Sequence, residues 1–421
     1  MTNYLDRLLK AIPGGAHVHS KGYDSYPSTA PKITFKGKGA YLYDENNNKY
    51  LDYGMALRSV TIGYSEEDID NAVMQQIING NTSSFPTLIE LEAAERLISY
   101  IDSVDMVKFT KDGSTATTAA VKLARAYTGR SIVARCADQP FFSYDDWFIG
   151  TTDNNAGCLK ETVNKTKLFE YNNINSLKNL ISEHYNKIAC VIMEPATYLM
   201  EPQDNYLSEV RDLCDKNDIV LIFDEIITGF RWHMKGAQYY YKVQPDLCTF
   251  GKAMANGYSL SALGGRRELM DLGSISAKDR VFLLSSTHGA EMSSLGAFIA
   301  TMNFFEEHDV ISHLKDYGEK LILMMNELIL TYDLPHSLVI DGLPWLPRYT
   351  TIGLNGKRDP DLTLLFQQEM ARHGVLMRNI IICYRHSANE LEMTRNAFEK
   401  TLIVYKKALE NGVSQYLEEN K

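Results

Sequence analysis

Two acidic residues at the end of an apolar run raise the question of which positive group they meet. Residues 219–223 are all apolar and are followed directly by Asp224 and Glu225. A carboxylate buried at the end of a strand is costly unless a charged or hydrogen-bonding partner compensates it. Lys252 follows a second run, residues 247–250, between small and apolar neighbours. A lysine in such surroundings can supply a free amine for covalent catalysis, whereas a surface lysine is the simpler alternative.

A third chemical feature follows the apolar run at residues 106–110. Gly113 permits a tight turn there, and Ser114 or Thr115 can cap the helix that comes next. Unpaired N–H groups and the helix dipole at such a start attract an anion, for example a phosphate. An ordinary strand-to-helix turn with a serine cap would use the same residues.

The middle of the chain alternates short apolar runs with helical patterns, which are the elements that would position these residues. Strands are expected at residues 106–110, 131–135, 189–194, 219–223, 247–250 and 281–286. Helices are expected at residues 115–127, 174–185, 206–216 and 295–306. This alternation predicts an α/β fold with a mainly parallel sheet. Because ligands bind at the carboxyl ends of parallel strands, the three chemical features are expected at one sheet edge.

The two ends of the chain do not show the strand–helix alternation of the middle. Residues 1–20 predict a short helix that ends at Pro13-Gly14-Gly15, and residues 33–54 predict strands around a polar turn. From about residue 310, long helical patterns enclose a strand region, which predicts an α+β domain. We therefore expect an N-terminal segment at 1–60, a large domain at 61–308 and a small C-terminal domain at 309–421.

Composition limits the classes of partner. The chain has 421 residues, a formal charge of -10 and scattered basic residues, which argues against nucleic acid or a membrane surface as the main partner. Its six cysteines form no CxxC pair, and no metal site is expected. The first residues lack the apolar core of a signal peptide, so a cytoplasmic location is expected.

One cofactor needs all three chemical features together. Pyridoxal 5'-phosphate (PLP) requires an anion site for its phosphate, an amine for its aldehyde and a carboxylate for its ring nitrogen. A helix start at Gly113-Ser114, Lys252 and Asp224 would provide these groups. The residues therefore predict a PLP enzyme.

The chain resembles the class III aminotransferases of PLP fold type I, in the branch of glutamate-1-semialdehyde 2,1-aminomutase and its relatives. The resemblance rests on "GAYLYDENNNKYLDY", "VDMVKFTKDGSTATTAAVKLARAYTGR", "FDEIITGFR", "PDLCTFGKAMANGYSLSALGG" and "SSTHGAEMSSLGAF". It implies a large domain with a mainly parallel seven-stranded sheet and a smaller α+β C-terminal domain.

The resemblance also implies roles for single residues. Lys252 would bind the cofactor aldehyde and then move a proton between the carbons of substrate and cofactor, and Asp224 would pair with the ring nitrogen. Ile226 would pack on one face of the ring, and Gly113 and Ser114 would hold the phosphate.

Thr287, in "SSTHGAE", would reach the phosphate in the neighbouring subunit, which implies a homodimer with shared active sites. A hydroxyl that caps the next helix is the alternative for Thr287. The family's Tyr-His-Gly segment reads Phe141-Phe142-Ser143 here, so Phe141 can stack on a ring but has no hydroxyl. The phosphate loop reads "KDGST" in place of "NSGTE", which brings Asp112 near the expected phosphate.

The substrate side departs further from the aminomutase pattern. Ser20 and Lys21 are the candidates for holding a substrate carboxylate, and Arg58 could grip a carboxylate or phosphate or form a structural salt bridge. We therefore expect a PLP-dependent aminotransferase that acts on a sugar-like carbonyl or a small aldehyde or keto acid. The alternatives are a true 2,1-aminomutase for glutamate-1-semialdehyde or an analogue, a PLP-dependent decarboxylase or racemase, and a regulator or binding module.

Overall fold

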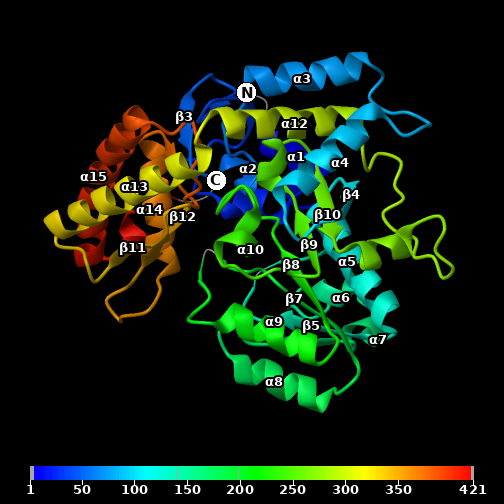
Figure 1. Ribbon diagram of the computed structural model, residues 1–421. Coiled ribbons are helices and arrows are strands. Elements are labelled where there is room, and N and C mark those ends of the chain that lie inside the picture. The colour runs from blue at the N-terminus through cyan, green and yellow to red at the C-terminus, as the bar shows by residue number, and fades with distance from the viewer. Residues whose placement is uncertain (1–3, 140, 198, 419–421) are drawn as a thin grey trace. The chain divides into compact units, whose positions relative to one another are not determined.

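The computed structural model describes residues 4–139, 141–197 and 199–418 and separates into two compact units (Figure 1). We call residues 67–311 the central unit, and residues 1–66 with 312–421 the terminal unit. Residues 1–3 of the expected N-terminal segment and 419–421 of the expected C-terminal domain lie outside the description. The expected domain boundaries, near residues 60 and 308, stay a prediction.

Within the described residues, the central unit contains a seven-stranded sheet in the order β4-β10-β9-β8-β7-β5-β6. Its strands are β4 (Met106–Thr110), β5 (Ile132–Cys136), β6 (Thr166–Phe169), β7 (Ile188–Met193), β8 (Val220–Asp224), β9 (Leu247–Phe250) and β10 (Ser261–Gly265). Strands β9, β8, β7, β5 and β6 run parallel, and β10 is antiparallel to both β9 and β4. The predicted α/β fold with a mainly parallel sheet is confirmed.

The helices of the central unit include those expected around the sheet. They are α3 (Glu67–Ile78), α4 (Leu88–Tyr100), α5 (Gly113–Thr128), α6 (Asp146–Ile149), α7 (Lys160–Val163), α8 (Ile174–Glu183), α9 (Tyr206–Lys216), α10 (Gly236–Tyr240), α11 (Arg267–Met270) and α12 (Met292–Glu307). Helix α5 ends at Gly129, whose φ of 66° is the left-handed conformation that glycine adopts without strain. None of the helices in the described ranges combines the length and the hydropathy that a membrane span requires.

Both faces of the sheet are buried, because successive residues of each strand point into two different cores. Ile192 and Ile222 pack on the face that α5 covers. Val191 and Leu221 pack on the opposite face, together with α8 and α9, which lie side by side in Figure 1. Such two-sided burial explains the near-continuous apolar runs that predicted these strands.

One predicted strand is wrong and two strands had no counterpart in the prediction. Residues 281–286 are irregular in the structure. Their apolar pattern arises because Val281 and Leu283 are buried in the core beside α5 without joining the sheet. Strands β6 and β10 were not predicted. The sequence of β10, Ser-Ala-Leu-Gly-Gly, lacks the β-branched and aromatic residues that mark strands.

The described part of the terminal unit contains a sheet in the order β1-β2-β3-β13 and a two-stranded hairpin. Its strands are β1 (Thr34–Lys38), β2 (Tyr41–Asp44), β3 (Lys49–Asp52), β11 (Leu338–Leu343), β12 (Leu346–Thr351) and β13 (Val375–Leu376). Its helices are α1 (Tyr4–Ala11), α2 (Met55–Arg58), most of α13 (Val310–Thr331), α14 (Pro360–Arg372) and α15 (Ala388–Asn411). Helix α15 begins with a capping box formed by Ser387 and Glu390.

Candidate active site

Asp224 is the last residue of β8 and is buried at the carboxyl end of the parallel strands. Its Oδ1 accepts hydrogen bonds from the Ile226 amide, at 3.0 Å, and from the Thr249 hydroxyl, at 3.2 Å. Burial raises the pKa of Asp224 to about 6, against the opposing effects of these bonds and of the Lys252 charge. The protein therefore holds a carboxylate here whose charge is only partly compensated.

Lys252 follows β9, on the strand next to β8, at the same edge of the sheet. It begins a short 3-10 helix, Lys252–Ala255, and is half-buried. Its φ of 45° lies in the left-handed region, which a side-chain-bearing residue adopts only when its surroundings hold it there. Lys252 is thus a constrained residue, close enough to Asp224 for its charge to act on the pKa of that carboxyl.

The Ile226 side chain, which follows β8, lies close to the residues that follow two other strands, β4 and β9. A Cβ placed on Gly113, the first residue of α5, would lie 2.3 Å from Ile226 Cδ1, so a side chain there would displace Ile226. A Cβ placed on Gly251, the residue before Lys252, would lie 3.4 Å from Ile226 Cγ2. The structure therefore brings together the residues that follow β4, β8 and β9, as the predicted topology requires.

The start of α5 combines a helix N-terminus, which can bind an anion, with a negatively charged side chain of the protein itself. Ser114 is buried, and its Oγ accepts a hydrogen bond of 3.3 Å from the Tyr144 amide. Asp112 is the N-cap of the helix, and its Oδ1 accepts from the Thr115 amide at 2.8 Å while its Oδ2 accepts from the Thr115 hydroxyl at 2.8 Å. The carboxylate therefore faces the helix start, where it competes with any other anion for the same positive potential.

Glu225 has a different environment from its neighbour Asp224. Its carboxylate accepts hydrogen bonds from the Thr228 hydroxyl, the Ala237 amide and the Gln238 amide, at 2.9, 2.6 and 3.0 Å. Burial raises the pKa of Glu225, and these donors oppose that shift. Glu225 thus links the turn after β8 to the start of α10, which is a structural role.

The remaining cofactor candidates of the central unit lie on loops. Phe141 is exposed and meets the Phe148 ring edge-on, with ring centroids 5.6 Å apart. Thr287 is exposed on a turn, and the N-cap of the next helix is Glu291, so the helix-capping alternative for Thr287 is wrong. Among the described residues, neither Phe141 nor Thr287 forms a hydrogen bond or ring contact with Asp224 or Lys252.

The three substrate candidates belong to the terminal unit. Arg58 ends the short turn α2, where its φ of 76° is left-handed. Lys21 is exposed and lines a cavity, and the backbone oxygen of Ser20 accepts a hydrogen bond of 2.5 Å from Arg378 Nη1. Ser20 therefore acts through its main chain in this structure.

Thr249 is a site residue that the sequence did not reveal. The register of β8 and β9 pairs Asp224 with Thr249, which places the hydroxyl on the carboxylate. A threonine in a short apolar run carries no local signal of such a role, because register depends on tertiary packing.

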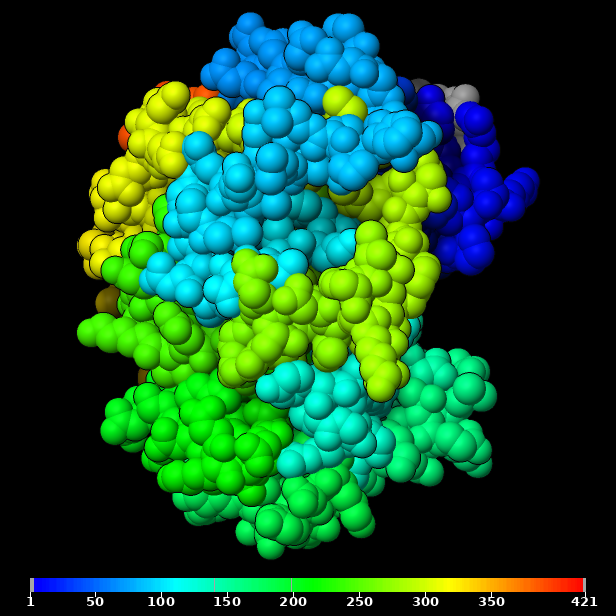
Figure 2. All heavy atoms as spheres, turned by 45° about the vertical axis from the view of Figure 1, so that its right-hand side comes forward, coloured from blue at the N-terminus to red at the C-terminus, as the bar shows by residue number. Residues whose placement is uncertain are grey.

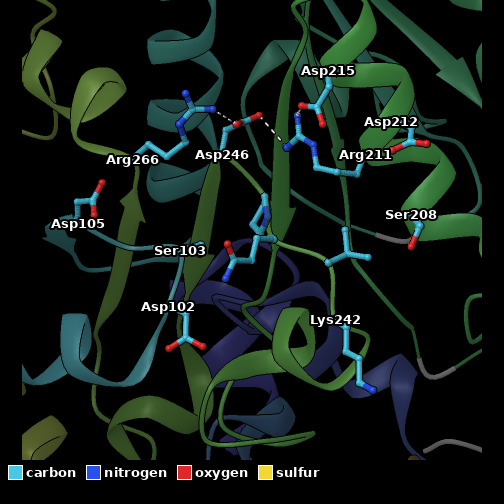
Figure 3. A pocket seen from close by; sticks show the side chains of 13 residues that line it. Asp102, Ser103, Asp105, Ser208, Arg211, Asp212, Asp215, Lys242, Asp246 and Arg266 are labelled. Atoms are coloured by element: carbon cyan, nitrogen blue, oxygen red, sulfur yellow. Dashed lines mark hydrogen bonds and ion pairs between the residues drawn. The ribbon is translucent and has the colours of Figure 1, made fainter.

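A different cavity of about 620 Å³ lies at the opposite edge of the same sheet (Figure 3). Asp246, directly before β9, pairs there with Arg266 Nη1 at 2.6 Å and Arg211 Nη1 at 3.0 Å, and it accepts the Leu221 amide at 2.7 Å. Figure 3 shows the two arginines on either side of Asp246. Asp246, Arg211 and Arg266 are therefore engaged with one another, and we take the cluster around Asp224 as the candidate active site.

Comparison with known proteins agrees with the geometry. The model of the class-III aminotransferases matches residues 25–345. The chain is 32% identical over 413 residues to 3-aminobutyryl-CoA aminotransferase of Cloacimonas acidaminovorans, covering 96% of this chain and 97% of that protein. It is 32% identical over 347 residues to glutamate-1-semialdehyde 2,1-aminomutase of Francisella philomiragia, covering 80% and 79%. The FumI protein of Sphingopyxis sp. MTA144 has the same fold, with a TM-score of 0.87, 24% identity and 97% coverage of both chains.

Proposed function

This chain belongs to the class-III aminotransferase family, and we propose that it is a PLP-dependent aminotransferase that moves an amino group to a carbonyl substrate. The observation that carries the proposal is the convergence at one sheet edge of Asp224, Lys252 and the Gly113-Ser114 helix start around Ile226. These are the groups that PLP requires.

The residues present fit this cofactor. Gly113 and Ser114, at the start of α5, would hold the phosphate. Ile226 would support one face of the ring. Among the described residues, both hydrogen bonds to the Asp224 carboxylate end on Oδ1, so Oδ2 is the acceptor that a protonated ring nitrogen would meet. Phe141 would stack on the other face once the loop that carries it lies over the ring.

Bound PLP would supply an aldehyde for covalent capture of the amino group and an electron-withdrawing ring. Asp224 would keep the ring nitrogen protonated, because a buried carboxylate without full compensation favours a positive partner. Lys252 would hold the aldehyde, and its amine would move a proton at the reacting carbon.

The substrate side supports amino transfer to a compound other than glutamate-1-semialdehyde. The segment after "IPGG" provides Ser20 and Lys21, and Arg58 remains a further candidate for holding a carboxylate or phosphate. A sugar-like carbonyl, a small aldehyde or a keto acid fits the proposal. Aminomutase activity on glutamate-1-semialdehyde or an analogue is the second candidate, favoured by the relationship to the Francisella aminomutase.

The test of the cofactor is spectroscopic. The purified protein should be yellow, and borohydride should fix the cofactor on Lys252, where mass spectrometry of peptides finds it. A panel of amino donors should bleach the yellow band as the amine is transferred, and a carbonyl acceptor should restore it. A Lys252→Ala variant with the spectrum of the wild type would contradict the proposal.

The same panel separates the alternative reactions. Release of CO₂ from an amino acid would identify a decarboxylase, and loss of optical activity without transfer would identify a racemase. Conversion of glutamate-1-semialdehyde without any second substrate would identify the aminomutase. A protein that binds PLP but turns over none of these compounds would be a regulator or binding module.

We also propose a homodimer in a reducing, cytoplasmic environment. Exposed apolar side chains gather on α3, the following loop and α4, and we call them the α3–α4 patch: Met74, Ile77, Ile78, Phe85, Leu88 and Leu91. Figure 2 shows α3 and α4 in blue to cyan on the same face as the yellow-green segment that carries Thr287. Several exposed apolar side chains on these elements support a protein interface, and the six free cysteines support a reducing compartment.

Light scattering after size-exclusion chromatography tests the dimer. Ile78→Asp combined with Phe85→Asp should shift the wild-type dimer toward monomer, because each charge would be buried in the interface. Leu323→Asp is the matched control, since Leu323 is exposed but lies on α13. A monomeric wild-type protein would refute the proposal.

A further inference from the structure

A row of buried hydrogen bonds leads to Glu225, the residue next to Asp224. It joins Ser103, Gln238 and Glu225, which come from the segment before β4, from α10 and from the turn after β8. All three residues belong to the central unit and are buried. Buried polar side chains satisfy their donors and acceptors inside the protein, so each bond of the row constrains the direction of the next.

The Ser103 hydroxyl sets the orientation of the Gln238 side-chain amide. Ser103 Oγ donates to Gln238 Oε1 at 2.5 Å. An amide has one oxygen and one NH2 group, so an oxygen that faces the hydroxyl leaves the nitrogen for the other end of the row. Gln238 Nε2 accordingly donates to Glu225 Oε1 at 3.0 Å. The row therefore directs an N–H group at a carboxylate, which as an anion can only accept.

The Glu225 carboxylate is surrounded by neutral donors. Four donor groups reach it: the Thr228 hydroxyl, the Ala237 amide, and the main-chain and side-chain amides of Gln238. In the part of the chain that the structure describes, no lysine or arginine forms an ion pair with Glu225. Hydrogen bonds from neutral groups favour the charged form, but they do not cancel the charge as a bound cation would. The negative field of Glu225 therefore extends beyond its own contacts.

The backbone around Glu225 holds this charge in a fixed place. The Glu225 amide donates to the Thr249 oxygen at 2.9 Å, and the Glu225 carbonyl accepts from the Gly229 amide at 2.8 Å. A Cβ placed on Gly236 would lie 2.7 Å from Glu225 Oε1 and 2.9 Å from Oε2. The main chain thus approaches the carboxylate closely on the side of α10, and the side chain has no room to turn there.

The fixed charge acts on Asp224. The turn that Glu225 begins also carries Ile226, whose amide donates to Asp224 Oδ1 at 3.0 Å. Both carboxylates are buried, and charges interact more strongly in such surroundings than in water. Burial is the main cause that raises the pKa of Asp224, and the negative charge of Glu225 acts in the same direction. A charge that favours a proton on Asp224 also favours a positive group placed against it.

We propose that Ser103 and Gln238 are positioning residues of the amino-transfer site and act through Glu225. They hold a second buried negative charge beside Asp224, so that the protonated ring nitrogen of PLP meets the field of two carboxylates while it contacts one. This inference rests on the proposed function, because it concerns the partner of the cofactor nitrogen.

A purely structural network would have a different signature in cofactor binding. Loss of packing weakens the binding of every cofactor of the same shape, whereas loss of a negative charge weakens only the binding of a cofactor with a protonated nitrogen. 1-Deaza-PLP, in which a carbon replaces the ring nitrogen, has nearly the shape of PLP and cannot carry that proton. The ratio of the two dissociation constants therefore measures the negative potential at the nitrogen position.

Fluorescence titration of the PLP-free protein with PLP and with 1-deaza-PLP measures this ratio. The wild type should prefer PLP about tenfold or more. Gln238→Met removes the N–H group at similar side-chain length and should lower the preference about three- to tenfold, because the charged form of Glu225 loses a donor. Ser103→Ala should lower it about two- to fivefold, and Ser103→Thr, which keeps the hydroxyl, should restore it.

Gln368→Met is the matched control. Gln368 is a buried residue of α14 in the terminal unit. Its Nε2 also donates to a carboxylate, Glu369 Oε1 at 2.9 Å, and its Oε1 accepts from the Glu418 amide at 2.8 Å. The replacement removes the same groups from beside a different carboxylate and should leave the preference for PLP unchanged.

The outcomes separate this proposal from the proposed function. An equal loss of affinity for both compounds in Gln238→Met, or an equal fall of the preference in Gln368→Met, would make the network structural and overturn the proposal. If Gln238→Met does not fold, the pair Ser103→Ala and Ser103→Thr decides in the same way. A wild type that binds both compounds equally would contradict the role of Asp224, and one that binds neither would contradict the proposed function itself.

Discussion

Asp224 and Asp246 lie at opposite ends of two neighbouring parallel strands: Asp224 is the last residue of β8, and Asp246 directly precedes β9. Both carboxylates are buried. Asp246 meets Arg211, Arg266 and the Leu221 amide. Asp224 accepts from one amide and one hydroxyl, and burial raises its pKa to about 6. An aspartate therefore has its charge compensated by two arginines at one end of the strands, whereas at the other end its charge is compensated only in part.

This difference separates structural from functional carboxylates. A buried charge with all its partners inside the protein holds elements together and has nothing left for a ligand. A buried charge that the protein compensates only in part is stabilised further by a positive ligand, which is the condition for a cofactor site. Glu225, one residue from Asp224, belongs with Asp246, because the turn to α10 supplies its donors.

The largest effect should come from Asp224→Asn. Removing the charge that faces the ring nitrogen should lower the rate of the half-reaction on the order of 10²–10³-fold, while PLP remains bound and the melting temperature does not fall. Stopped-flow absorbance with a saturating amino donor measures this. Turnover within a few fold of the wild type would remove the distinction between the two aspartates.

Asp246→Asn should show the reverse behaviour. Two arginines would lose their buried partner, and because Arg266 is half exposed we expect a loss of about 1–3 kcal/mol in the free energy of unfolding. The half-reaction rate of the folded enzyme should stay unchanged. Urea denaturation measures the loss, with Asp212→Asn as the control, since Asp212 is an exposed residue of the same cavity and should stay within about 0.5 kcal/mol.

The raised pKa of Asp224 predicts a pH dependence in the PLP-free protein. The native carboxyl titrates near pH 6 and the unfolded one near 3.8. Between these values the native state holds a proton that the unfolded state releases, so stability from this group is present below about pH 4 and is lost as the pH rises through 6. From pH 4.5 to 7, Asp224→Asn should therefore gain about 2 kcal/mol relative to the wild type.

Denaturation curves of both proteins across this pH range measure the gain. If the two stability curves run parallel, Asp224 is not a penalised carboxylate, and its contrast with Asp246 disappears.

The smallest effect concerns Asp112, the cap of α5. Asp112→Asn keeps the side-chain acceptor for the Thr115 amide but removes the negative charge beside the proposed phosphate position. The dissociation constant for PLP should fall about two- to fivefold, with an unchanged melting temperature. Fluorescence titration of the PLP-free protein measures the constant. Weaker binding in the variant would mean that the Asp112 charge supports the site.

The sequence by itself determined which residues end which strands. Short, mainly apolar runs identified β4, β5, β7, β8 and β9, because strands buried on both faces are rich in apolar residues. The positions of Asp224, Lys252 and Gly113 after three of these runs then predicted a shared edge. Local pattern failed where it had no strand signal, as in β10, or where an apolar segment packed without pairing, as at residues 281–286.

Tertiary structure decided what depends on contacts between distant residues. The register of β8 and β9 placed Thr249 on Asp224, and side-chain packing brought Ile226 against Gly113. The cavity of the terminal unit needs Lys21 and Arg378, which are far apart in the chain, on one lining. Periodicity along the chain specifies which face of an element is buried, but only packing specifies which residues of other elements meet that face.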